Sequence, residues 1–414
     1  MYIKRKLEGT ILTYLDAPEI FAIVGPRQCG KTTMLKNIQS GLKDSAFINF
    51  EDIEILTMFE NDIKEFAKKY LAQKYLFIDE FQHASHGGKN LKFLYDTYPD
   101  KKIIISGSSA IDLTIKALKF LVGRVFIFNL FGLDFEEYLS FRDPSLFPLY
   151  TEYQRHISWK GLKISPLKIG DVINGQLQAV AEEFIIWGGY PRVATTVGEE
   201  EKKIVLKNIY NTYFLRDIKD ILGLIDDYRM KKLIEATAVQ IGQLVDYNEL
   251  GQMASYDYLT LKKYLNVLEK TFICQPIRPF FSNRRKEISK NPKIYFFDTG
   301  LRNYIVQNFN PLTIRVDKGQ LYENFVFTQL LKRDFTPNFW RSKTQSEVDF
   351  VIKAGPEIIP IESKSSANKA AVPHSLVSFI REYHPPHALI LGEASRHSTK
   401  TEKTKIHFLP RWII

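Results

Sequence analysis

The chain has 414 residues, a formal net charge of +10 and 45% hydrophobic residues. This length is enough for two to four domains, and the hydrophobic content excludes a largely disordered chain. The positive charge favours a polyanionic partner but is far below that of a histone-like protein. Two cysteines exclude a disulfide framework and suit a reducing compartment.

The amino-terminal stretch MYIKRKLEGTILTYL lacks the apolar core and the small-residue cleavage site of a signal peptide. No apolar run approaches the roughly 18 residues that a membrane helix needs. We therefore expect a cytoplasmic protein that has no membrane partner.

A phosphate-binding loop follows the first apolar run of the chain. Residues 20–24 are predicted to be a buried strand, and the next nine residues, GPRQCGKTT, match G-x-x-x-x-G-K-[ST]. The glycines let successive backbone N–H groups point at phosphate oxygens, while Lys31 places a charge on the β- and γ-phosphates and Thr32 can bind Mg²⁺. The helix that begins near Thr32 aims its positive end at the same anion. The predicted binding residues for ATP are Gly25, Pro26, Arg27, Gln28, Cys29, Gly30, Lys31, Thr32 and Thr33.

Two carboxylates end the next motif, KYLFIDE. Asp79 at the end of a strand suits Mg²⁺, and Glu80 beside it suits polarising the water that attacks the γ-phosphate. An isolated Asp-Glu pair is more often an ordinary strand end, but the phosphate loop upstream favours the functional interpretation. A side chain that can accept a proton from water favours hydrolysis of ATP over transfer of its phosphate to a metabolite. A metabolite kinase is therefore a weak third possibility.

The remaining apolar runs of residues 1–142 are expected to complete one parallel sheet. They show no alternation, as is typical of strands covered on both faces, and lie at 46–50, 75–78, 103–105 and 125–130. Arg124 precedes the last run. It is predicted either to reach the nucleotide of a neighbouring subunit as an arginine finger or to lie on the surface in a salt bridge. Residues 1–142 are therefore predicted to form a P-loop ATPase core of the α/β class.

Residues 143–225 are predicted to be an insertion followed by a helical lid. The part up to residue 178 is rich in Pro, Gly and aromatic residues, and we expect it to be irregular. The motif WGGYPRVA then breaks one helix and starts the next, with Pro191 in the first turn. This break is either a helix–helix corner or a nucleotide lid, in which Pro191 packs on adenine and Arg192 lies near the phosphates.

Residues 226–300 are predicted to form a winged helix. Helices are expected at 228–241, 247–254 and 257–270, followed by two strands that a basic loop joins. In such folds the third helix enters the major groove of DNA and the loop contacts the backbone. The alternative is that this fold mediates protein contacts or serves as a lid. The predicted DNA-binding residues are Lys262, Lys263, Arg284, Arg285 and Lys286.

The last part of the chain, residues 301–414, carries a second set of chemically active side chains. Glu323 lies on a predicted helix at 319–333 and shares a face with Phe327 and Leu330. A carboxylate on an apolar stripe is costly unless it is paired or bound to a metal ion.

Two strands supply the rest of this set. Asp349 lies in a strand at 346–352, and the period of two places Glu362 and Lys364 on one face of a strand at 358–366. This is the D…E-x-K arrangement of PD-(D/E)XK nucleases, in which the carboxylates hold Mg²⁺ or Mn²⁺ and the lysine activates water. The alternative is a retained fold that binds nucleic acid or protein without cleaving it.

The chain resembles a prokaryotic family of AAA-type ATPases that lie near the archaeal ATPase and STAND-like P-loop groups. The resemblance rests on the order of GPRQCGKTT, FIDEFQ, SGSS, GRV, GGYPRV, KIYFFDTGL, LYENFVFTQL and EVDFVI…PIESKSS. It implies an ASCE-type head, a winged-helix middle domain and a restriction-endonuclease-like α/β tail. It also implies that Ser106 or Ser108 senses the γ-phosphate and that Arg124 is the arginine of the GR pair. Cys29 and Ser363 replace residues that are often aliphatic in the family, and neither change removes a reacting group.

Two functions are therefore expected to compete. The first is an ATP-hydrolysing, DNA-associated protein whose nucleotide state controls a nuclease-like tail. The second is a STAND-like switch with slow ATP turnover, protein partners and an inactive tail. Either protein is compatible with a homo-oligomer.

Overall fold

The computed structural model describes residues 2–107, 120–159, 162–165, 168–211, 218, 222, 228–281, 287, 290–364, 371–393 and 396–414. The chain divides into two compact units. Unit 1 comprises residues 1–133, 190–195 and 270–272. Unit 2 comprises residues 134–189, 196–269 and 273–414.

A five-stranded parallel sheet forms the centre of unit 1. Its strands are β1 (Ile20–Val24), β2 (Ser45–Asn49), β3 (Tyr75–Asp79), β4 (Lys102–Gly107) and β5 (Val125–Asn129), in the order β2-β3-β4-β1-β5. Every residue of β1 and β4 is buried, which explains why these runs are apolar without alternation. The expected parallel sheet is confirmed, and each strand ends within two residues of its predicted position.

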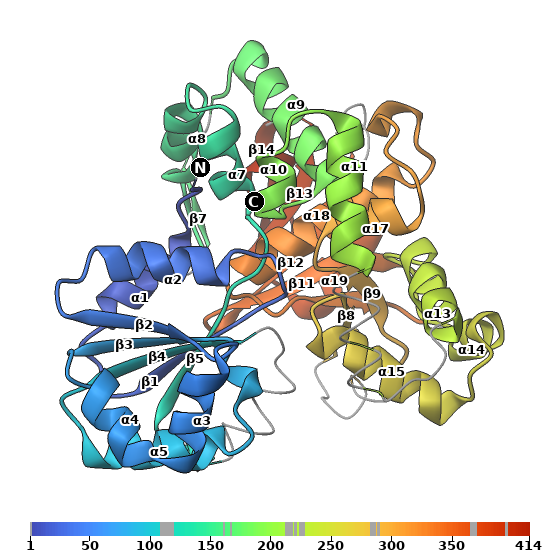
Figure 1. Ribbon diagram of the computed structural model, residues 1–414. Coiled ribbons are helices and arrows are strands. Elements are labelled where there is room, and N and C mark those ends of the chain that lie inside the picture. The colour runs from blue at the N-terminus through green and yellow to red at the C-terminus, as the bar shows by residue number, and fades with distance from the viewer. Residues whose placement is uncertain are drawn as a thin grey trace. The chain divides into compact units, whose positions relative to one another are not determined.

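Helices cover both faces of this sheet, with α1 and α2 on one side and α3, α4 and α5 on the other (Figure 1). Unit 1 contains α1 (Lys6–Thr13), α2 (Lys31–Ser40), α3 (Ile53–Asn61), α4 (Ile63–Tyr70), the 3₁₀ helix η1 (Phe81–His83), α5 (Gly87–Thr97) and α10 (Pro191–Ala194). Ile11 of α1 and Leu35 of α2 pack with Phe21 and Phe77 of the sheet in one buried cluster.

Unit 2 begins with helices, and two of them lie wholly or partly where an irregular segment was expected. It contains α7 (Phe135–Arg142), α8 (Phe147–Gln154), β6 (Ile157–Ser158), β7 (Lys163–Ile164), α9 (Asp171–Trp187) and α11 (Glu199–Asn208). The prediction that residues 143–178 are irregular is therefore wrong, since they include α8 and the first half of α9. Tertiary packing explains the difference: the Tyr150 ring lies 6.1 Å from that of Trp412, and Gln154 donates to the Ile413 carbonyl at 2.6 Å.

The middle of unit 2 has the predicted order of helices and strands. It contains α13 (Tyr228–Val239), α14 (Tyr247–Ala254), α15 (Tyr258–Lys270), β8 (Cys274–Ile277) and β9 (Lys293–Phe296). Strands β8 and β9 are antiparallel, and Leu244 forms a further antiparallel bridge to Lys293. Leu261, Leu265 and Leu268 of α15 are buried and form the apolar stripe of this helix.

A six-stranded mixed sheet forms the last part of unit 2. Its elements are α17 (Thr299–Ile305), η4 (Leu312–Ile314), α18 (Lys318–Lys332), β10 (Asn338–Arg341), β11 (Glu347–Ala354), β12 (Glu357–Ser363), α19 (His374–Tyr383), β13 (His387–Gly392), β14 (Arg396–Thr401), β15 (Thr404–Pro410) and η5 (Arg411–Ile413). The strand order is β10-β11-β12-β13-β15-β14. Strands β10, β11 and β12 are mutually antiparallel, whereas β12, β13 and β15 are parallel.

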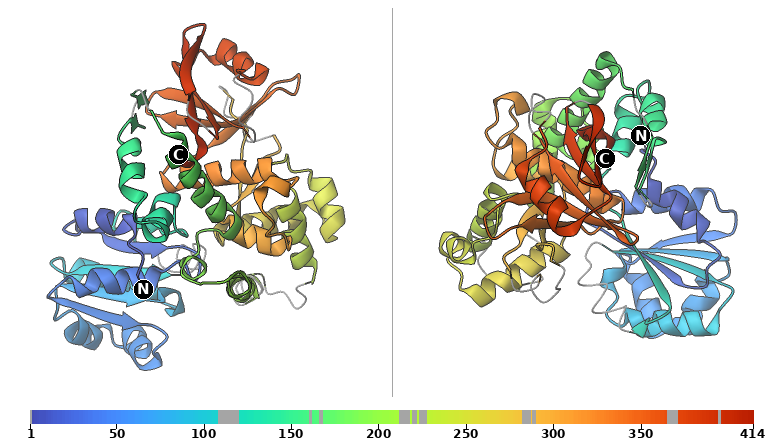
Figure 2. Two further views of the ribbon diagram at one scale, coloured as in Figure 1. Left: turned by 90° about the horizontal axis from the view of Figure 1, so that it is seen from above. Right: turned by 180° about the vertical axis from the view of Figure 1, so that it is seen from behind.

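Helices α18 and α19 both pack on this sheet, which Figure 2 shows in orange to red. Phe379 of α19 packs in a buried cluster with Val351 and Ile390. On the α18 side, the Tyr295 ring of β9 lies 5.2 Å from Phe327 and 5.4 Å from Phe350. Because Phe350 and Val351 point to opposite faces of β11, the two helices cover opposite faces of the sheet.

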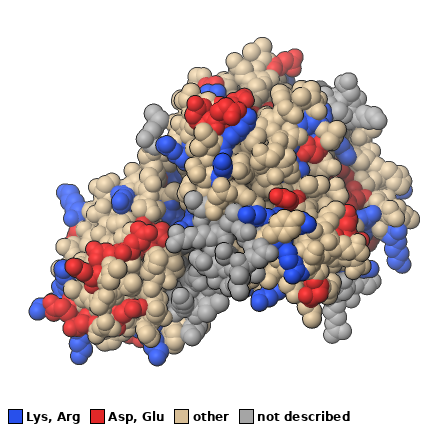
Figure 3. Space-filling view, turned by 45° about the vertical axis from the view of Figure 1, so that its right-hand side comes forward, with Lys and Arg blue, Asp and Glu red and all other residues tan. Residues whose placement is uncertain are grey.

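In the part of the chain that the structure describes, no helix combines the length and the apolar composition that crossing a bilayer requires. Figure 3 shows Lys and Arg side chains interspersed with Asp and Glu on the face that it presents. On that face, the excess positive charge is therefore not gathered into one continuous patch.

Candidate functional site

The phosphate-binding loop joins β1 to α2 at the carboxyl edge of the parallel sheet. Gly30 has a φ of +97° and Gln28 a φ of +59°, so the backbone takes the left-handed turns that curl it. A Cβ atom added at Gly25 would lie only 2.0 Å from the Leu130 carbonyl oxygen. Residue 25 must therefore be glycine, because the end of β5 passes directly against it.

Lys31 lies inside this loop and is buried. Its ammonium group donates to the carbonyl oxygens of Gly25 at 2.9 Å and Pro26 at 2.8 Å. The cation is therefore held at the mouth of the curled backbone, where a phosphate group would bind. The predicted role of Lys31 fits this geometry.

Three polar side chains meet where β3 and β4 end beside the loop. The Thr32 hydroxyl donates to one carboxylate oxygen of Asp79 at 2.6 Å, and the Ser106 hydroxyl donates to the other. Asp79 is 2% exposed, and these two donors compensate the burial of its charge. A threonine hydroxyl and a carboxylate are the oxygen ligands that Mg²⁺ prefers. The donor set therefore fits the predicted magnesium site.

Glu80 follows this group in a strained conformation. Its φ of +52° lies in the left-handed region, which non-glycine residues seldom adopt. The turn separates its carboxylate from that of Asp79 and lets it accept a hydrogen bond from the Gln82 side chain. Backbone strain of this kind concentrates at functional positions and supports the predicted catalytic role of Glu80.

Arg5 is a member of this site that sequence reasoning missed. Its buried guanidinium donates to the carbonyl oxygens of Cys29 and Phe131, both at 2.7 Å. It thus ties the phosphate loop to the segment after β5. No local motif marks an arginine 24 residues before its partner, so only the folded chain identifies it.

Pro191 lies near the phosphate loop, whereas Arg124 does not. A Cβ atom added at Gly30 would be 3.8 Å from Cγ of Pro191, and Arg192 is exposed on the same short helix, α10. Arg124 precedes β5 at the opposite end of the β1–β5 pair from the loop, roughly 16 Å away at about 3.3 Å per residue. It forms a salt bridge of 3.0 Å with Asp96, which is the second of the two predicted arrangements.

Some predicted residues lie outside the described residues or apart from both sites. Ser108, Arg284, Arg285 and Lys286 are outside the described part of the chain. Lys262 and Lys263 are both exposed on α15. The Lys262 ammonium lies 4.3 Å from the centre of the Tyr258 ring and 5.4 Å from that of Tyr247.

The structure brings the predicted C-terminal residues to neighbouring positions in the mixed sheet. Asp349 of β11 accepts a hydrogen bond from the backbone N–H of Ser363 at 2.7 Å. Glu362 accepts from the Lys364 ammonium at 3.0 Å and from the Ser375 hydroxyl at 2.7 Å. This direct contact is compatible with the prediction that Glu362 and Lys364 share one face.

Glu323 of α18 joins the same group through residues that the sequence did not single out. It accepts a hydrogen bond from the Tyr295 hydroxyl at 2.8 Å and lies 3.9 Å from the Lys293 ammonium. Lys293 is buried and also pairs with Glu347. Both Lys293 and Tyr295 come from the motif KIYFFDTGL, in which a lysine that begins an apolar strand was the available signal.

Burial and mutual repulsion raise the pKa values of these carboxyl groups. Burial first and the Asp349 charge second raise the pKa of Glu323 to about 8 and that of Glu362 to about 7. Burial also raises the pKa of Asp349. Burial lowers the pKa of Lys364, but the charges of Glu362 and Asp349 outweigh it, so the pKa of Lys364 is raised overall.

The second predicted metal site has two lysines among its carboxylates. Among the described residues, no three Asp, Glu, His or Cys side chains are placed to hold one metal ion. Lys293 and Lys364 instead supply the positive charge around the carboxylates. We therefore derive no step through Mg²⁺ or Mn²⁺ at this end of the chain.

The corner WGGYPRVA is anchored in unit 2 just before the chain enters unit 1. The Asp298 carboxylate accepts hydrogen bonds from the backbone N–H groups of Gly189 at 2.7 Å and Leu301 at 2.8 Å. A Cβ atom on Gly188 would lie 2.2 Å from the same carboxylate, and Gly188 has a φ of +79°. The next residue after Gly189, Tyr190, belongs to unit 1.

Comparisons with known proteins match three successive parts of the chain. Residues 17–139 match the model of an AAA domain, whereas residues 179–312 and 318–412 match two domains of unknown function, DUF8612 and DUF4143. An uncharacterized protein of Haemophilus influenzae is 23% identical over 378 residues, covering 85% of this chain and 84% of that protein. An uncharacterized protein of Methanocaldococcus jannaschii is 27% identical over 353 residues, covering 81% and 72%.

Among solved structures, a Walker-type ATPase of Pyrococcus abyssi aligns with a TM-score of 0.46 and 15% identity. The alignment covers 74% of this chain and 96% of that one. The AAA domain match includes the phosphate loop, Asp79 and Ser106. Together with the geometry of these residues, it supports an AAA-type P-loop ATPase that binds and hydrolyses ATP.

Proposed function

We propose that this protein is a Mg²⁺-dependent ATPase associated with DNA, in which the nucleotide state controls a nuclease-like C-terminal domain. The observation that carries the ATPase assignment is the contact of Thr32 and Ser106 with Asp79 beside the phosphate loop. Such a group combines a carboxylate and a hydroxyl that could hold Mg²⁺ with a hydroxyl that could sense the γ-phosphate.

Residues of the phosphate loop and of the end of β3 would have different roles in ATP hydrolysis. When ATP binds, the Lys31 ammonium group would donate to phosphate oxygens in place of the carbonyl oxygens of Gly25 and Pro26. Thr32 and Asp79 would hold Mg²⁺, which neutralises charge on the phosphate oxygens. Glu80, once released from Gln82, would accept a proton from the attacking water.

The corner at Gly188 and Gly189 supports control of the C-terminal domain by nucleotide. Pro191 lies near Gly30 of the phosphate loop, in unit 1. Two residues earlier, Gly189 is hydrogen-bonded to Asp298, in unit 2. A shift of Pro191 when nucleotide binds would therefore pull on a backbone that is fixed at Asp298.

The exposed side chains of α15 support association with DNA. Lys262 and Lys263 are exposed on the third helix of the predicted winged helix. The ring of Tyr258 lies against Lys262 and holds its ammonium group at the surface. Phosphate contacts from such lysines are independent of base sequence and weaken with salt.

The test measures DNA cleavage and ATP hydrolysis in the same reactions. Labelled linear and supercoiled DNA would be incubated with Mg²⁺ or Mn²⁺, with and without ATP, using the wild type and Lys364→Ala. Lys403→Ala, at a lysine outside the carboxylate cluster, is the control. ATP-dependent cleavage that only Lys364→Ala loses supports the proposal.

One observation favours a second function, a STAND-like switch with protein partners and an inactive C-terminal domain. Glu323, Glu362 and Lys364 are already paired with groups of the protein, as in a polar network whose role is structural. Absence of cleavage under every condition, with ATP turnover indifferent to DNA, would favour this switch.

A further inference from the structure

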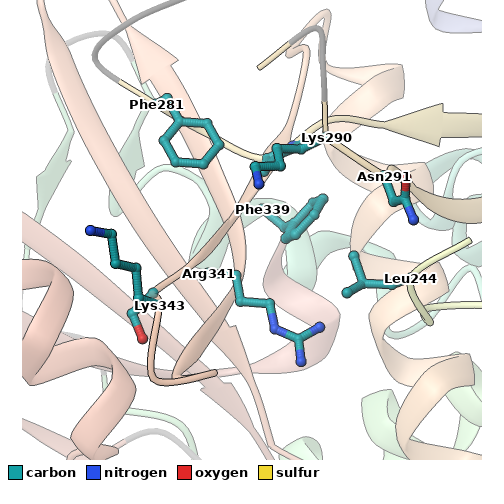
Figure 4. Close-up of a pocket in the computed structure, with 9 residues that line it drawn as sticks. Leu244, Phe281, Lys290, Asn291, Phe339, Arg341 and Lys343 are labelled. Carbon is teal, nitrogen blue, oxygen red and sulfur yellow. The ribbon is translucent and has the colours of Figure 1, made fainter. Parts of the chain in front are cut away.

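A cavity of about 670 Å³ lies in unit 2 and has no part in the functions described above. Leu244, Phe281 and Phe339 give the cavity an apolar lining. Three cationic side chains also line it: Lys290, Arg341 and Lys343. The volume lies within the range of roughly 300–1,000 Å³ that is typical of ligand pockets. Figure 4 shows the Phe281 and Phe339 rings and, between them in that view, the side chain of Lys290.

The walls of this cavity are joined by backbone pairing. The N–H of Phe339 donates to the Arg278 carbonyl at 3.2 Å, and the N–H of Phe280 donates to the Phe339 carbonyl at 2.5 Å. Val245 donates to the Pro292 carbonyl at 2.8 Å, which fixes the wall that carries Leu244. Backbone hydrogen bonds therefore fix the segments that carry Leu244 and Phe339.

The cavity has an excess of positive charge. Lys290 and Lys343 are exposed, and within the described part of the chain neither takes part in an ion pair. Arg341 lies 3.9 Å from Glu347, but Glu347 is shared with the buried Lys293. An anion with an apolar or aromatic body fits this combination of rings and cations.

The cavity adjoins the C-terminal carboxylate cluster. Glu347 contacts Arg341 on the cavity side and Lys293 on the cluster side, and Lys293 reaches Glu323 at 3.9 Å. The Lys293 ammonium also lies 5.6 Å from the centre of the Phe339 ring. A ligand held in the cavity would therefore be next to Glu323 and its neighbours.

We propose that this cavity binds an unpaired nucleotide of a single-stranded nucleic acid, a proposal that rests on the nucleic-acid association proposed above. The base stacks on Phe281, above the buried Phe339. The flanking phosphates contact Lys290, Arg341 and Lys343. An unpaired strand fits better than a duplex because only a splayed base can stack on the Phe281 ring.

The experiment measures binding of fluorescein-labelled oligothymidylate and of a duplex of the same length by the full-length protein, over a series of salt concentrations. The variants are Phe281→Leu, which keeps the apolar bulk but removes the ring, and the pair Lys290→Ala and Lys343→Ala. The control is the pair Lys353→Ala and Lys403→Ala, two lysines of the same unit outside the cavity. Circular dichroism and the thermal unfolding midpoint of each variant check that the protein is folded.

We expect Phe281→Leu to weaken single-strand binding on the order of 5- to 100-fold while leaving duplex binding unchanged. The lysine pair should lower the salt slope of single-strand binding by about 0.7 for each phosphate that the variant no longer neutralises. An excess of thymidine monophosphate should not compete with the oligomer, because a strand binds through several phosphates; full competition would overturn the assignment of a strand.

Three other results would overturn the proposal, each for a different reason. Equal weakening of single-strand and duplex binding would show that these residues bind phosphates of either form and do not select an unpaired base. Unchanged single-strand binding in all variants would exclude the cavity and leave the proposed function intact. Binding of neither form by the wild type would exclude the nucleic-acid association and, with it, this site.

Discussion

The backbone N–H of Gly189 donates a hydrogen bond of 2.7 Å to the Asp298 carboxylate, two residues before Pro191 approaches the phosphate loop. Asp298 is buried and also accepts from the N–H of Leu301 at the start of α17. One carboxylate therefore fixes a helix start and the corner of the chain that leads to the nucleotide site.

Asp298→Ala should uncouple the two units. ATP affinity should be kept, while protection of the C-terminal part from limited proteolysis should no longer respond to ATP. Because the variant also removes a helix cap, stability should fall by about 1–2 kcal/mol. Asp246→Ala is the matched control, since Asp246 caps α14 in the same way without contacting the corner. An identical proteolysis pattern in both variants would contradict the coupling.

Lys31→Ala should lose ATP binding. The ammonium group is placed at the mouth of the loop by the Gly25 and Pro26 carbonyls, and charged hydrogen bonds to phosphate are worth about 1.5–3 kcal/mol each. The affinity should fall on the order of 10- to 100-fold, measured by calorimetry or with a fluorescent ATP analogue. Lys36→Ala, exposed on the same helix, is the control. Tight binding by Lys31→Ala would refute the phosphate-loop assignment.

Glu80→Gln should bind ATP normally but hydrolyse it slowly. Removal of a general base typically costs about 10²–10⁴-fold in rate. Steady-state phosphate release and ATP affinity, measured on the same preparation, separate the two steps. Glu54→Gln changes an exposed carboxylate on α3 and should leave turnover unchanged. Unchanged turnover in Glu80→Gln would remove Glu80 from the water-activating role.

Stability should depend on pH through Glu323. Its pKa is raised from 4.5 to about 8, so the folded chain binds more protons than the unfolded chain between these values. The free energy of unfolding should therefore fall as pH rises from about 4.5 to 8, by roughly 1.4 kcal/mol or less per pH unit for one group.

Denaturant unfolding of the wild type and Glu323→Gln at pH 5, 7 and 9 measures this effect. The difference in stability should shift in favour of the variant as pH rises, because glutamine has no charge to bury. Glu382→Gln, exposed on α19, reports the effect of removing a surface carboxylate. A pH-independent difference would show that Glu323 is equally charged in the folded and unfolded chains.

Neutralising Arg284, Arg285 and Lys286 together should weaken DNA binding across all sequences. Each phosphate that the variant no longer neutralises should lower the slope of log affinity against log salt by about 0.9. The control replaces three exposed lysines of unit 1, Lys43, Lys64 and Lys68. Equal salt slopes for both triple variants would favour a role in protein contacts for the predicted winged helix.

The sequence alone predicted the candidate nucleotide site because the residues of that site are close together in the chain. The phosphate loop is nine consecutive residues, and its turns are set by glycines at defined spacings. Asp79 could be proposed because it ends an apolar strand downstream of the loop, whereas the family resemblance indicated Ser106 or Ser108. The spacing of Glu362 and Lys364 was equally readable, since a strand puts alternate residues on one face.

Only the tertiary structure decided which distant residues complete these sites. Arg5 reaches the phosphate loop from an amino-terminal segment, and Lys293 of β9 joins the carboxylates by pairing with Glu323 of α18. The helix α8 was missed although Tyr150 and Tyr153 follow helical spacing, and the partner on which both rings pack, Trp412, is distant in the chain. Such contacts depend on the burial of groups far apart in the chain, and no local spacing encodes the geometry in which they meet.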